Sequence, residues 1–496
     1  MADFYSPWVE TLDYVQAFVS VTIHFPPLYS LFLGILGAGS ENPEYAFLLN
    51  TLCLSVALFI VVIWLKKETE NVALSYTVAT LTLVLPTLLL LSQELWSEFL
   101  FMVFFYLFLY VFSHKEMQKE HFFLCALLAG LMTLTRSIGL SVVIAYSIYL
   151  LYKRPRFFWV YLVVAISPFI YLKFKSSSNP FRENYVDAFK ARVPDLFNTN
   201  IFDYASEQLV SLWQSWVYLF SPIQWSLLPV QVETIILTVL LLAFFIGFFL
   251  RLLEHRIDAL IVIIYLAIVA VWPYSEVRFV SRFLSPLLPL IFFYSILGNR
   301  FVFSRLKLAR HCYVIPVLVV LVIISSDLHI LKRAYASMEP ELKPYSRIKE
   351  WLTHVSYENA ISEVKTRKRY LEILKQLQDY IPEDDCTYAI HPPVTMLHTK
   401  RMSGSYLDAA SSVDELLERL PTCNYMIASY LVDHTEDYDA YYPMDLVWDS
   451  DRFEFYAFYL DEEAGSEQKS QILLMLIKRI DNESLIDKNR QTGNKK

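Results

Sequence analysis

Ionisable side chains gather beside apolar runs of the chain, where their types suit phosphate and hydroxyl chemistry. Glu94 and Glu98 lie four residues apart in SQELWSEF, so a helix places both on one face. Arg136 stands in TRSIG between two apolar runs. The segment PYSEVRFVSRFLSPLLP adds four further polar side chains: Tyr274, Glu276, Arg278 and Arg282. Near the start of the chain, related residues precede a double proline: Glu10, Asp13, Tyr14 and His24.

Together these residue types predict a site for a substrate that carries both a phosphate and a hydroxyl. Arginine presents planar donors to phosphate oxygens. A carboxylate can deprotonate a hydroxyl or bind a metal ion, so a divalent cation is the one candidate cofactor. Simpler interpretations stay open: Glu276 and Arg278 form a local ion pair, Arg282 reaches lipid headgroups, and the carboxylates are solvated.

The composition divides the chain into two regions. Of 496 residues, 55% are hydrophobic and only 19% are charged, against about 25% in soluble proteins. Residues 331–496 carry 21 Lys and Arg against 29 Asp and Glu, whereas residues 1–330 carry 21 of each. A membrane body followed by an acidic soluble domain is indicated. The charge argues against nucleic-acid binding, and the lack of a C-x-x-C pair argues against zinc.

The apolar runs predict about ten membrane-spanning helices. Each run approaches the roughly 20 residues that cross a bilayer. The predicted spans are 44–65, 72–91, 95–113, 121–136, 138–152, 157–174, 231–251, 258–273, 283–298 and 312–327.

Basic residues decide whether the run 121–152 forms one helix or a helical hairpin. If it is a helical hairpin, the compact basic loops all fall on one face, which is then cytoplasmic. These loops contain Lys66, Lys67, Lys115, Lys119, Lys153, Arg154, Arg156, Arg251, Arg256, Arg300, Arg305, Lys307 and Arg310. The candidate site residues consequently lie on the opposite, non-cytoplasmic face. A transporter would need access from both faces.

The segments outside the spans complete the predicted domains. Residues 1–43 form an outer loop in which 27–38 is juxtamembrane or re-entrant, and 44–327 is the transmembrane domain. Within it, the outer loop 175–230 carries Trp213, Trp216 and Trp225, which predicts surface helices anchored by tryptophan. Residues 328–496 alternate helical and strand periods, which predicts a small non-cytoplasmic α/β domain.

The elements expected in this last domain are a helix at 360–380, strands at 386–390, 423–430, 453–460 and 470–479, and a helix at 413–420. Cys386 and Cys423 each stand at the start of a predicted strand. If those strands are parallel neighbours in an oxidising compartment, the two cysteines can form a disulfide; two unrelated buried thiols are the equal alternative.

The ordered elements around these residues resemble the GT-C superfamily of integral-membrane glycosyltransferases. They are an acidic residue ahead of a tyrosine, HFPPLYSLFLG, SQELWSEF, a TR at a helix end, and EVRFVSRFLSPLLPL. The branch that is most similar includes the lipid A aminoarabinose transferases and RgtA/B/C/D-like sugar transferases, with protein O-mannosyltransferases more distant. The resemblance covers roughly residues 5–330.

This resemblance implies transfer of a sugar from a polyprenyl-phosphate donor to a lipid, glycan or protein acceptor on the non-cytoplasmic face of a bacterial inner membrane. It implies an inverting reaction with Glu10 or Asp13 as the catalytic group, which acts as the base that takes the acceptor proton or as an electrostatic organiser. His24, Glu94 or Glu98, and Arg278 or Arg282 match substrate-binding positions of the family. The family begins with a transmembrane helix that is absent here, so we expect upstream coding sequence for about 20 apolar residues. A transporter or flippase of lipid-linked sugars is the rival hypothesis.

Overall fold

The structure is a computed structural model of the 496-residue chain. It describes residues 28–36, 44–92, 97–114, 118–176, 201–220, 230–271, 277–307, 311–314, 316–318, 320–321, 357–389, 395, 399–404, 412–414, 417, 423–429, 450, 452–459 and 472–479.

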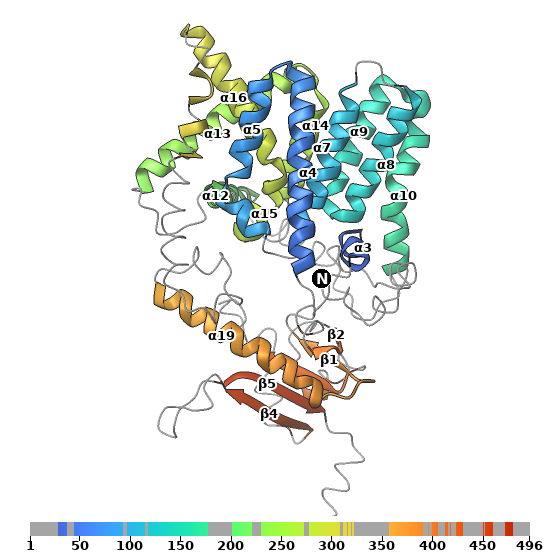
Figure 1. Ribbon diagram of the computed structural model, residues 1–496. Coiled ribbons are helices and arrows are strands. Elements are labelled where there is room, and N and C mark those ends of the chain that lie inside the picture. The colour runs from blue at the N-terminus through green and yellow to red at the C-terminus, as the bar shows by residue number, and fades with distance from the viewer. Residues whose placement is uncertain are drawn as a thin grey trace, which may run out of the picture.

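A helical body precedes a small domain built on a β-sheet (Figure 1). The α-helices of the body are α3 (Leu28–Ile35), α4 (Glu44–Thr69), α5 (Val72–Leu83), α6 (Pro86–Ser92), α7 (Glu98–Phe112), α8 (Lys119–Thr135), α9 (Leu140–Lys153), α10 (Phe158–Ser176), α12 (Ile201–Phe220), α13 (Val230–Leu253), α14 (Ile257–Ala270), α15 (Val277–Leu284) and α16 (Leu288–Arg305). Short 3₁₀ turns join some of them: η2 (Ser137–Gly139), η3 (Pro155–Phe157) and η4 (Ser285–Leu287).

The first nine predicted spans all overlap these helices, and half of the tenth lies outside the described residues. Within the described part of the chain, three helices are long and apolar enough to cross a bilayer: Tyr45–Thr69, Thr234–Leu253 and Val280–Arg305. Five apolar helices are shorter: Val72–Leu83, Glu98–Phe112, Ser137–Lys153, Phe158–Pro168 and Ile257–Ala270. The predicted class, an α-helical polytopic membrane protein, is confirmed.

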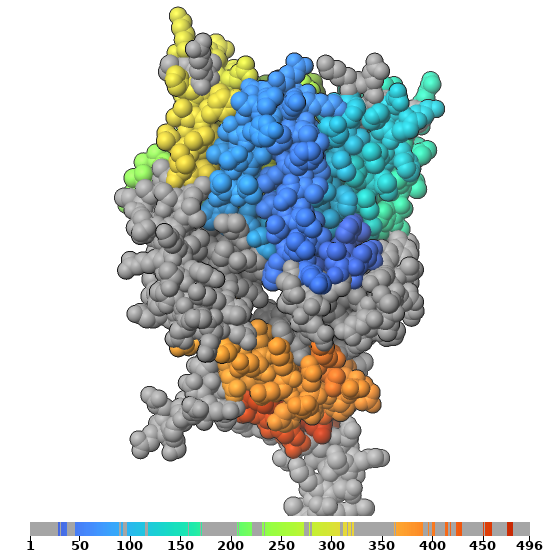
Figure 2. All heavy atoms as spheres, viewed as in Figure 1, coloured from blue at the N-terminus to red at the C-terminus, as the bar shows by residue number. Residues whose placement is uncertain are grey.

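The body turns an apolar surface outward and an aromatic core inward. Figure 2 shows α4 and α5 in blue beside the cyan helices as one continuous surface. Large apolar side chains such as Phe59, Tyr76 and Trp159 are exposed on the body, as lipid contact requires. Inside, Phe101, Phe105 and Phe108 of α7 and further aromatic rings are fully buried.

Two glycines let α13 and α16 touch backbone to backbone. A Cβ added at Gly247 would lie 1.9 Å from the carbonyl oxygen of Tyr294, and one added at Gly298 would lie 2.0 Å from that of Ala243. Any larger residue must therefore push the helices apart, as at other small-residue crossings in membranes.

The predicted hairpin at 121–152 is confirmed, because α8 ends at Thr135 and α9 begins at Leu140. Arg136 leaves the helix in an extended conformation, with φ −155° and ψ 141°. The Gly139 amide then donates to the carbonyl of Arg136 across 2.9 Å. A Cβ at Gly139 would lie 2.5 Å from the backbone of Met132, so this tight reversal requires glycine.

The region 201–220 corrects one prediction. It forms the helix α12, but Trp216 is buried in the protein rather than anchored at a membrane surface. Its indole Nε1 donates to the carbonyl of Leu237 on α13 across 3.3 Å, and its ring packs on Phe220 and Phe244. The sequence pattern shows only that Trp216 lies on the apolar face of an amphipathic helix. Such a face can pack against lipid or against protein, and the pattern does not distinguish the two. Trp225 lies outside the described residues.

The C-terminal domain is a five-stranded mixed sheet with a helix on one face. Its elements are α19 (Tyr357–Gln376), η7 (Leu377–Asp379), β1 (Cys386–Ala389), β2 (Met402–Gly404), β3 (Tyr425–Ser429), β4 (Phe453–Tyr459) and β5 (Ile472–Arg479). The strand order is β2-β1-β3-β5-β4, parallel from β2 to β3 and antiparallel from β3 to β4. The α/β class and four predicted strands are confirmed. The three-residue strand β2 was not predicted, and the helix expected at 413–420 lies mostly outside the described residues.

Both faces of the sheet are buried. On one face, Ile373 and Leu374 of α19 pack against Ile427 and Leu476. On the other, Met426 and Met475 pack with the partly buried Leu417. The domain thus has its own hydrophobic core.

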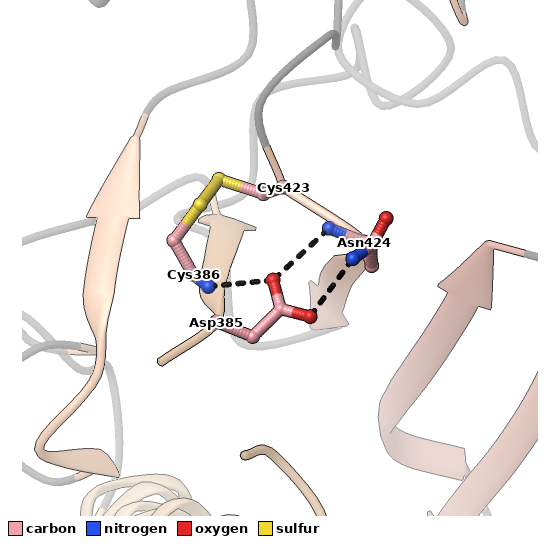
Figure 3. The surroundings of a disulfide bond; sticks show 4 residues. All are labelled: Asp385, Cys386, Cys423 and Asn424. Carbon is pink, nitrogen blue, oxygen red and sulfur yellow. Dashed lines mark hydrogen bonds between the residues drawn. A yellow bond between two sulfur atoms is a disulfide. The ribbon is translucent and has the colours of Figure 1, made fainter. Parts of the chain in front are cut away.

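The predicted disulfide is present (Figure 3). β1 and β3 are parallel neighbours, and Cys386 and Cys423 lie with their Cα atoms 4.9 Å apart. The carboxylate of Asp385 accepts hydrogen bonds from the backbone amides of Cys386 and Asn424, at 2.8 and 3.3 Å, and from the Asn424 side chain at 2.9 Å. These contacts hold the starts of the two strands together beside the bridge.

Candidate functional site

Three predicted site residues come together: Glu98, Arg136 and Arg282. Arg278 lies in α15, in the same short helix as Arg282. Six others lie outside the described residues: Glu10, Asp13, His24, Glu94, Tyr274 and Glu276. Their roles remain predictions.

One oxygen of Glu98 contacts both arginines. Arg282 Nε donates a short hydrogen bond to Glu98 Oε1. Arg136 Nη1 lies 2.5 Å from the same oxygen. The side chains of Glu98 and Arg136 are only 1% and 6% exposed, while that of Arg282 is 19% exposed. Arg136 is therefore not an isolated residue at the top of the hairpin, and Arg282 pairs with a carboxylate instead of reaching headgroups.

Three helix ends position this group, which we call the outer cluster (Glu98, Arg136 and Arg282). Glu98 begins α7, where the positive end of the helix dipole favours a carboxylate. Arg136 follows the last residue of α8, at the reversal that Gly139 permits. Arg282 lies in the last turn of α15, and its carbonyl accepts a 2.8 Å hydrogen bond from Ser285 at the start of η4. In Figure 1 these ends of the body face the sheet domain.

An aromatic side chain, Phe283, packs on the outer cluster, and two tyrosines hold the backbone around it. The guanidinium of Arg136 lies 4.8 Å from the ring centroid of Phe283, a cation–π contact. The Tyr265 hydroxyl donates to the carbonyl of Phe283 across 2.5 Å, and the Tyr106 hydroxyl donates to that of Pro286 across 2.8 Å. Arg136 is nearly inaccessible to water in this position, and low water access strengthens the attraction of its charge for an anion.

Among the described residues, the outer cluster combines two arginines with one carboxylate, a formal net charge of about +1. Glu98 Oε2 is buried without a hydrogen-bond partner among these residues, and Arg136 Nη1 is ion-paired with Glu98 Oε1 but makes no hydrogen bond. A site with this charge and these open bonds can hold an anionic group together with a polar neighbour.

A second ionic cluster lies at the opposite end of the body, and the sequence reasoning missed it. Arg251 binds Asp258 with two hydrogen bonds, of 2.8 and 3.1 Å, and contacts Glu68 at 3.0 Å. The Tyr294 hydroxyl donates to Asp258 across 2.8 Å, and Arg256 contacts Glu68 at 3.0 Å. We call these residues the inner cluster.

The inner cluster joins α4, α13, α14 and α16. In the sequence, Arg251 was interpreted only as a topogenic charge in a basic loop. An acidic residue seven positions later, at the start of the next helix, is the one signal that could have indicated a pair. The basic ends of α4, α9, α13 and α16 lie at this end, consistent with the predicted orientation of the basic loops.

Within the described ranges, no three His, Cys, Asp or Glu side chains come together as metal ligands would. Glu98 is the carboxylate that this part of the chain contributes to the outer cluster.

Comparisons with known proteins found a structural likeness without a match in sequence. No family model matches the chain, and no curated protein matches it. Two solved structures of ArnT from Cupriavidus metallidurans are similar to it, one in the apo state and one bound to undecaprenyl phosphate. For each, the identity is 11% and the TM-score 0.47, over 96% of this chain and 92% of the other.

Proposed function

We propose that this protein is a membrane glycosyltransferase of the GT-C type, which moves a sugar from a polyprenyl-phosphate donor to a lipid, glycan or protein acceptor. The observation that carries the proposal is the outer cluster: two arginines that share a single carboxylate oxygen, inside a membrane body and at one end of it. The GT-C sequence elements that Glu98, Arg136 and Arg282 belong to support the same conclusion.

The charge of the outer cluster suits a lipid-linked sugar phosphate. A phosphodiester carries one negative charge, which balances the formal net charge of about +1. Arg282 is the more exposed of the two arginines and is placed to meet the phosphate first. Arg136, held over Phe283, supplies a fixed charge that needs little reorganisation when negative charge develops on the leaving group.

In the proposed reaction, the acceptor hydroxyl oxygen attacks the anomeric carbon from the face opposite the phosphate. The bond between that carbon and the phosphate oxygen breaks, and polyprenyl phosphate leaves with the electron pair. The hydroxyl proton passes to a carboxylate, for which Glu10 and Asp13 of the first outer loop are the candidates. Such a base contributes about 10²–10⁴-fold to the rate.

The apolar middle of the body argues against the rival function, transport of a lipid-linked sugar. The described ionic side chains of the body interior gather in the outer and inner clusters at its two ends. Between them, α7 contributes the buried rings of Phe101, Phe105 and Phe108. A transporter needs a polar path across the membrane, and these side chains do not provide one.

We place the active face outside the cytoplasm of a bacterial inner membrane. The disulfide between Cys386 and Cys423 supports this placement, because structural disulfides persist in oxidising compartments. The basic ends of the helices at the opposite side of the body support it through the positive-inside rule.

The test is turnover of defined donors by the purified full-length protein in nanodiscs. A panel of polyprenyl-phosphate sugars is incubated with envelope lipid, glycan or protein acceptors, and free polyprenyl phosphate is measured together with the glycosylated acceptor. We expect both products from at least one donor. EDTA in a parallel reaction decides whether a divalent cation takes part. Movement of intact donor across the bilayer without release of polyprenyl phosphate would favour the flippase instead.

A further inference from the structure

We propose that Glu98 and Arg136 together recognise one hydroxyl group of the transferred sugar, which makes them specificity-determining residues for the donor. The proposal rests on the proposed function, because it names a substrate group held by the same outer cluster. Glu98 Oε2 would accept a hydrogen bond from this hydroxyl, and Arg136 Nη1 would donate one to it.

The two atoms are a buried acceptor and a buried donor with open hydrogen bonds. Glu98 Oε2 has no hydrogen-bond partner within the described chain. Arg136 Nη1 forms an ion pair with Glu98 Oε1 at 2.5 Å but makes no hydrogen bond within the described chain. Native proteins give nearly all buried polar atoms a hydrogen bond, and a buried charged atom without one is the most costly kind. A group brought by the substrate can supply both missing bonds.

The chemistry of the two atoms selects a hydroxyl. A hydroxyl donates through its hydrogen and accepts through its lone pairs, so one such group can satisfy both atoms. A carbonyl or ring oxygen cannot donate to Glu98. A protonated amine cannot accept from Arg136, and the guanidinium group of Arg136 would repel its positive charge. We therefore infer a neutral sugar with a hydroxyl here, and not an amino sugar.

The inner cluster provides an internal comparison. Glu68 Oε1 is also shared between two arginines, since Arg251 Nη1 and Arg256 Nη1 each lie 3.0 Å from it. The Glu68 side chain is 10% exposed, and neither of its oxygens is buried without a partner. Each cluster thus has a carboxylate oxygen shared by two arginines, but only in the outer cluster is the second oxygen of that carboxylate buried without a hydrogen-bond partner among the described residues. A carboxylate shared by two arginines therefore does not always leave one oxygen without a hydrogen bond, as Glu98 Oε2 is left here.

The experiment combines a substrate change with an enzyme change. For the donor sugar that the wild-type protein uses, single-position deoxy analogues are compared with the parent by kcat/KM, as polyprenyl-phosphate donors in nanodiscs. Each donor is tested with wild type, Glu98→Gln, Glu98→Asp and the matched control Glu68→Gln. Melting temperatures identify any variant that fails to fold.

We expect wild type to lose about 10²-fold or more in kcat/KM on one deoxy analogue, because a site built to bond a hydroxyl strongly rejects a substrate that lacks it. In Glu98→Gln and Glu98→Asp the parent donor becomes slower, and the same deoxy penalty shrinks to a few-fold. Glu68→Gln keeps the full penalty. A merely structural role of Glu98 would slow the parent and deoxy donors equally.

The opposing outcomes are separable from failure of the proposed function. Wild type that turns over the parent donor but tolerates every deoxy analogue within a few-fold overturns the hydroxyl site alone, and Glu98 Oε2 then binds water. A full deoxy penalty that persists in a folded Glu98 variant overturns it as well. If no Glu98 variant folds, the wild-type analogue series still decides. Absence of polyprenyl phosphate release from all donors overturns the proposed function and the hydroxyl site together.

Discussion

Arg282 and Glu98 form a short hydrogen bond although 184 positions of the chain separate them. The bond joins α15 to the first turn of α7, and it orients Arg282 before any donor binds. An arginine held in place by a carboxylate loses less side-chain entropy when it binds phosphate than a free one. This pair is therefore the part of the outer cluster that mutation should test first.

Replacement of Arg282 should weaken donor use more than it weakens folding. We expect Arg282→Ala to lower kcat/KM for the donor by about 10–10²-fold, since hydrogen bonds to charged groups contribute roughly 1.5–3 kcal/mol. Arg282→Lys should not restore it, because lysine lacks the planar pair of donors. Arg278→Ala should also chiefly affect the donor. Arg305→Ala, a basic residue at the other end of the body, is the control. Equal losses in all three alanine variants would contradict the assignment.

The acidic residues of the first outer loop are the predicted catalytic groups. Glu10→Gln or Asp13→Asn should abolish sugar transfer by removing the base, while membrane insertion and the melting temperature stay unchanged. The measurement is acceptor glycosylation by purified protein at matched concentration, with Lys66→Gln as the control. Near-normal transfer by both acidic variants would show that this loop is not catalytic.

The disulfide should stabilise the C-terminal domain. The bridge closes a loop with a sequence separation of 37 residues, for which about 2–4 kcal/mol is expected. Cys386→Ser/Cys423→Ser should therefore lower the melting temperature of this domain. Mass spectrometry of non-reduced peptides should recover the two cysteines linked, with Cys53, Cys125 and Cys312 as free thiols. Recovery of Cys386 and Cys423 as free thiols would contradict the prediction.

The inner cluster should contribute to stability and not to chemistry. Arg251→Ala leaves Asp258 buried without its bidentate partner, and breaking such a pair costs about 3–5 kcal/mol. We expect a clear drop in the melting temperature, with kcat/KM per folded molecule unchanged. Arg256→Ala removes a half-exposed partner of Glu68 and should cost far less. A catalytic defect in folded Arg251→Ala would give the inner cluster a role in the reaction.

The crossing of α13 and α16 should be intolerant of even one methyl group. Gly247→Ala or Gly298→Ala would bring a Cβ to within 2.0 Å of a backbone carbonyl oxygen of the facing helix, so the helices must separate. Gly130→Ala is the control, because its nearest neighbour is a side-chain atom of Pro168 at 3.1 Å. Thermal unfolding should rank both crossing variants well below the control. If all three melt alike, the helices can move apart without cost.

The sequence by itself determined most of the helices and strands of this protein. Apolar runs of limited length specify helices wherever they occur, so the spans from α4 to α16 could be predicted from local composition. Basic residues on either side of 121–152 predicted a helical hairpin and not a single helix there. The positive-inside rule allows this because it depends only on the distribution of charge along the chain. The strand of Cys386 and that of Cys423 were predicted from their residue patterns in the same way. A disulfide between the two cysteines was one of two equal alternatives, the other being two unrelated buried thiols. The pattern of a single strand does not specify which strand lies beside it.

Tertiary structure decided which side chains meet. Glu98 lies at the start of α7, Arg136 follows the end of α8, and Arg282 lies in the last turn of α15. Only the packing of the body brings the two arginines to one carboxylate oxygen of Glu98. Packing also buried Trp216 against α13, where the sequence predicted contact with the membrane surface. It likewise paired Arg251, which the sequence indicated only as a topogenic charge, with Asp258. The physical reason is common to these cases: residue spacing reports which face a helix presents, whereas the neighbour that covers this face depends on the arrangement of all the others.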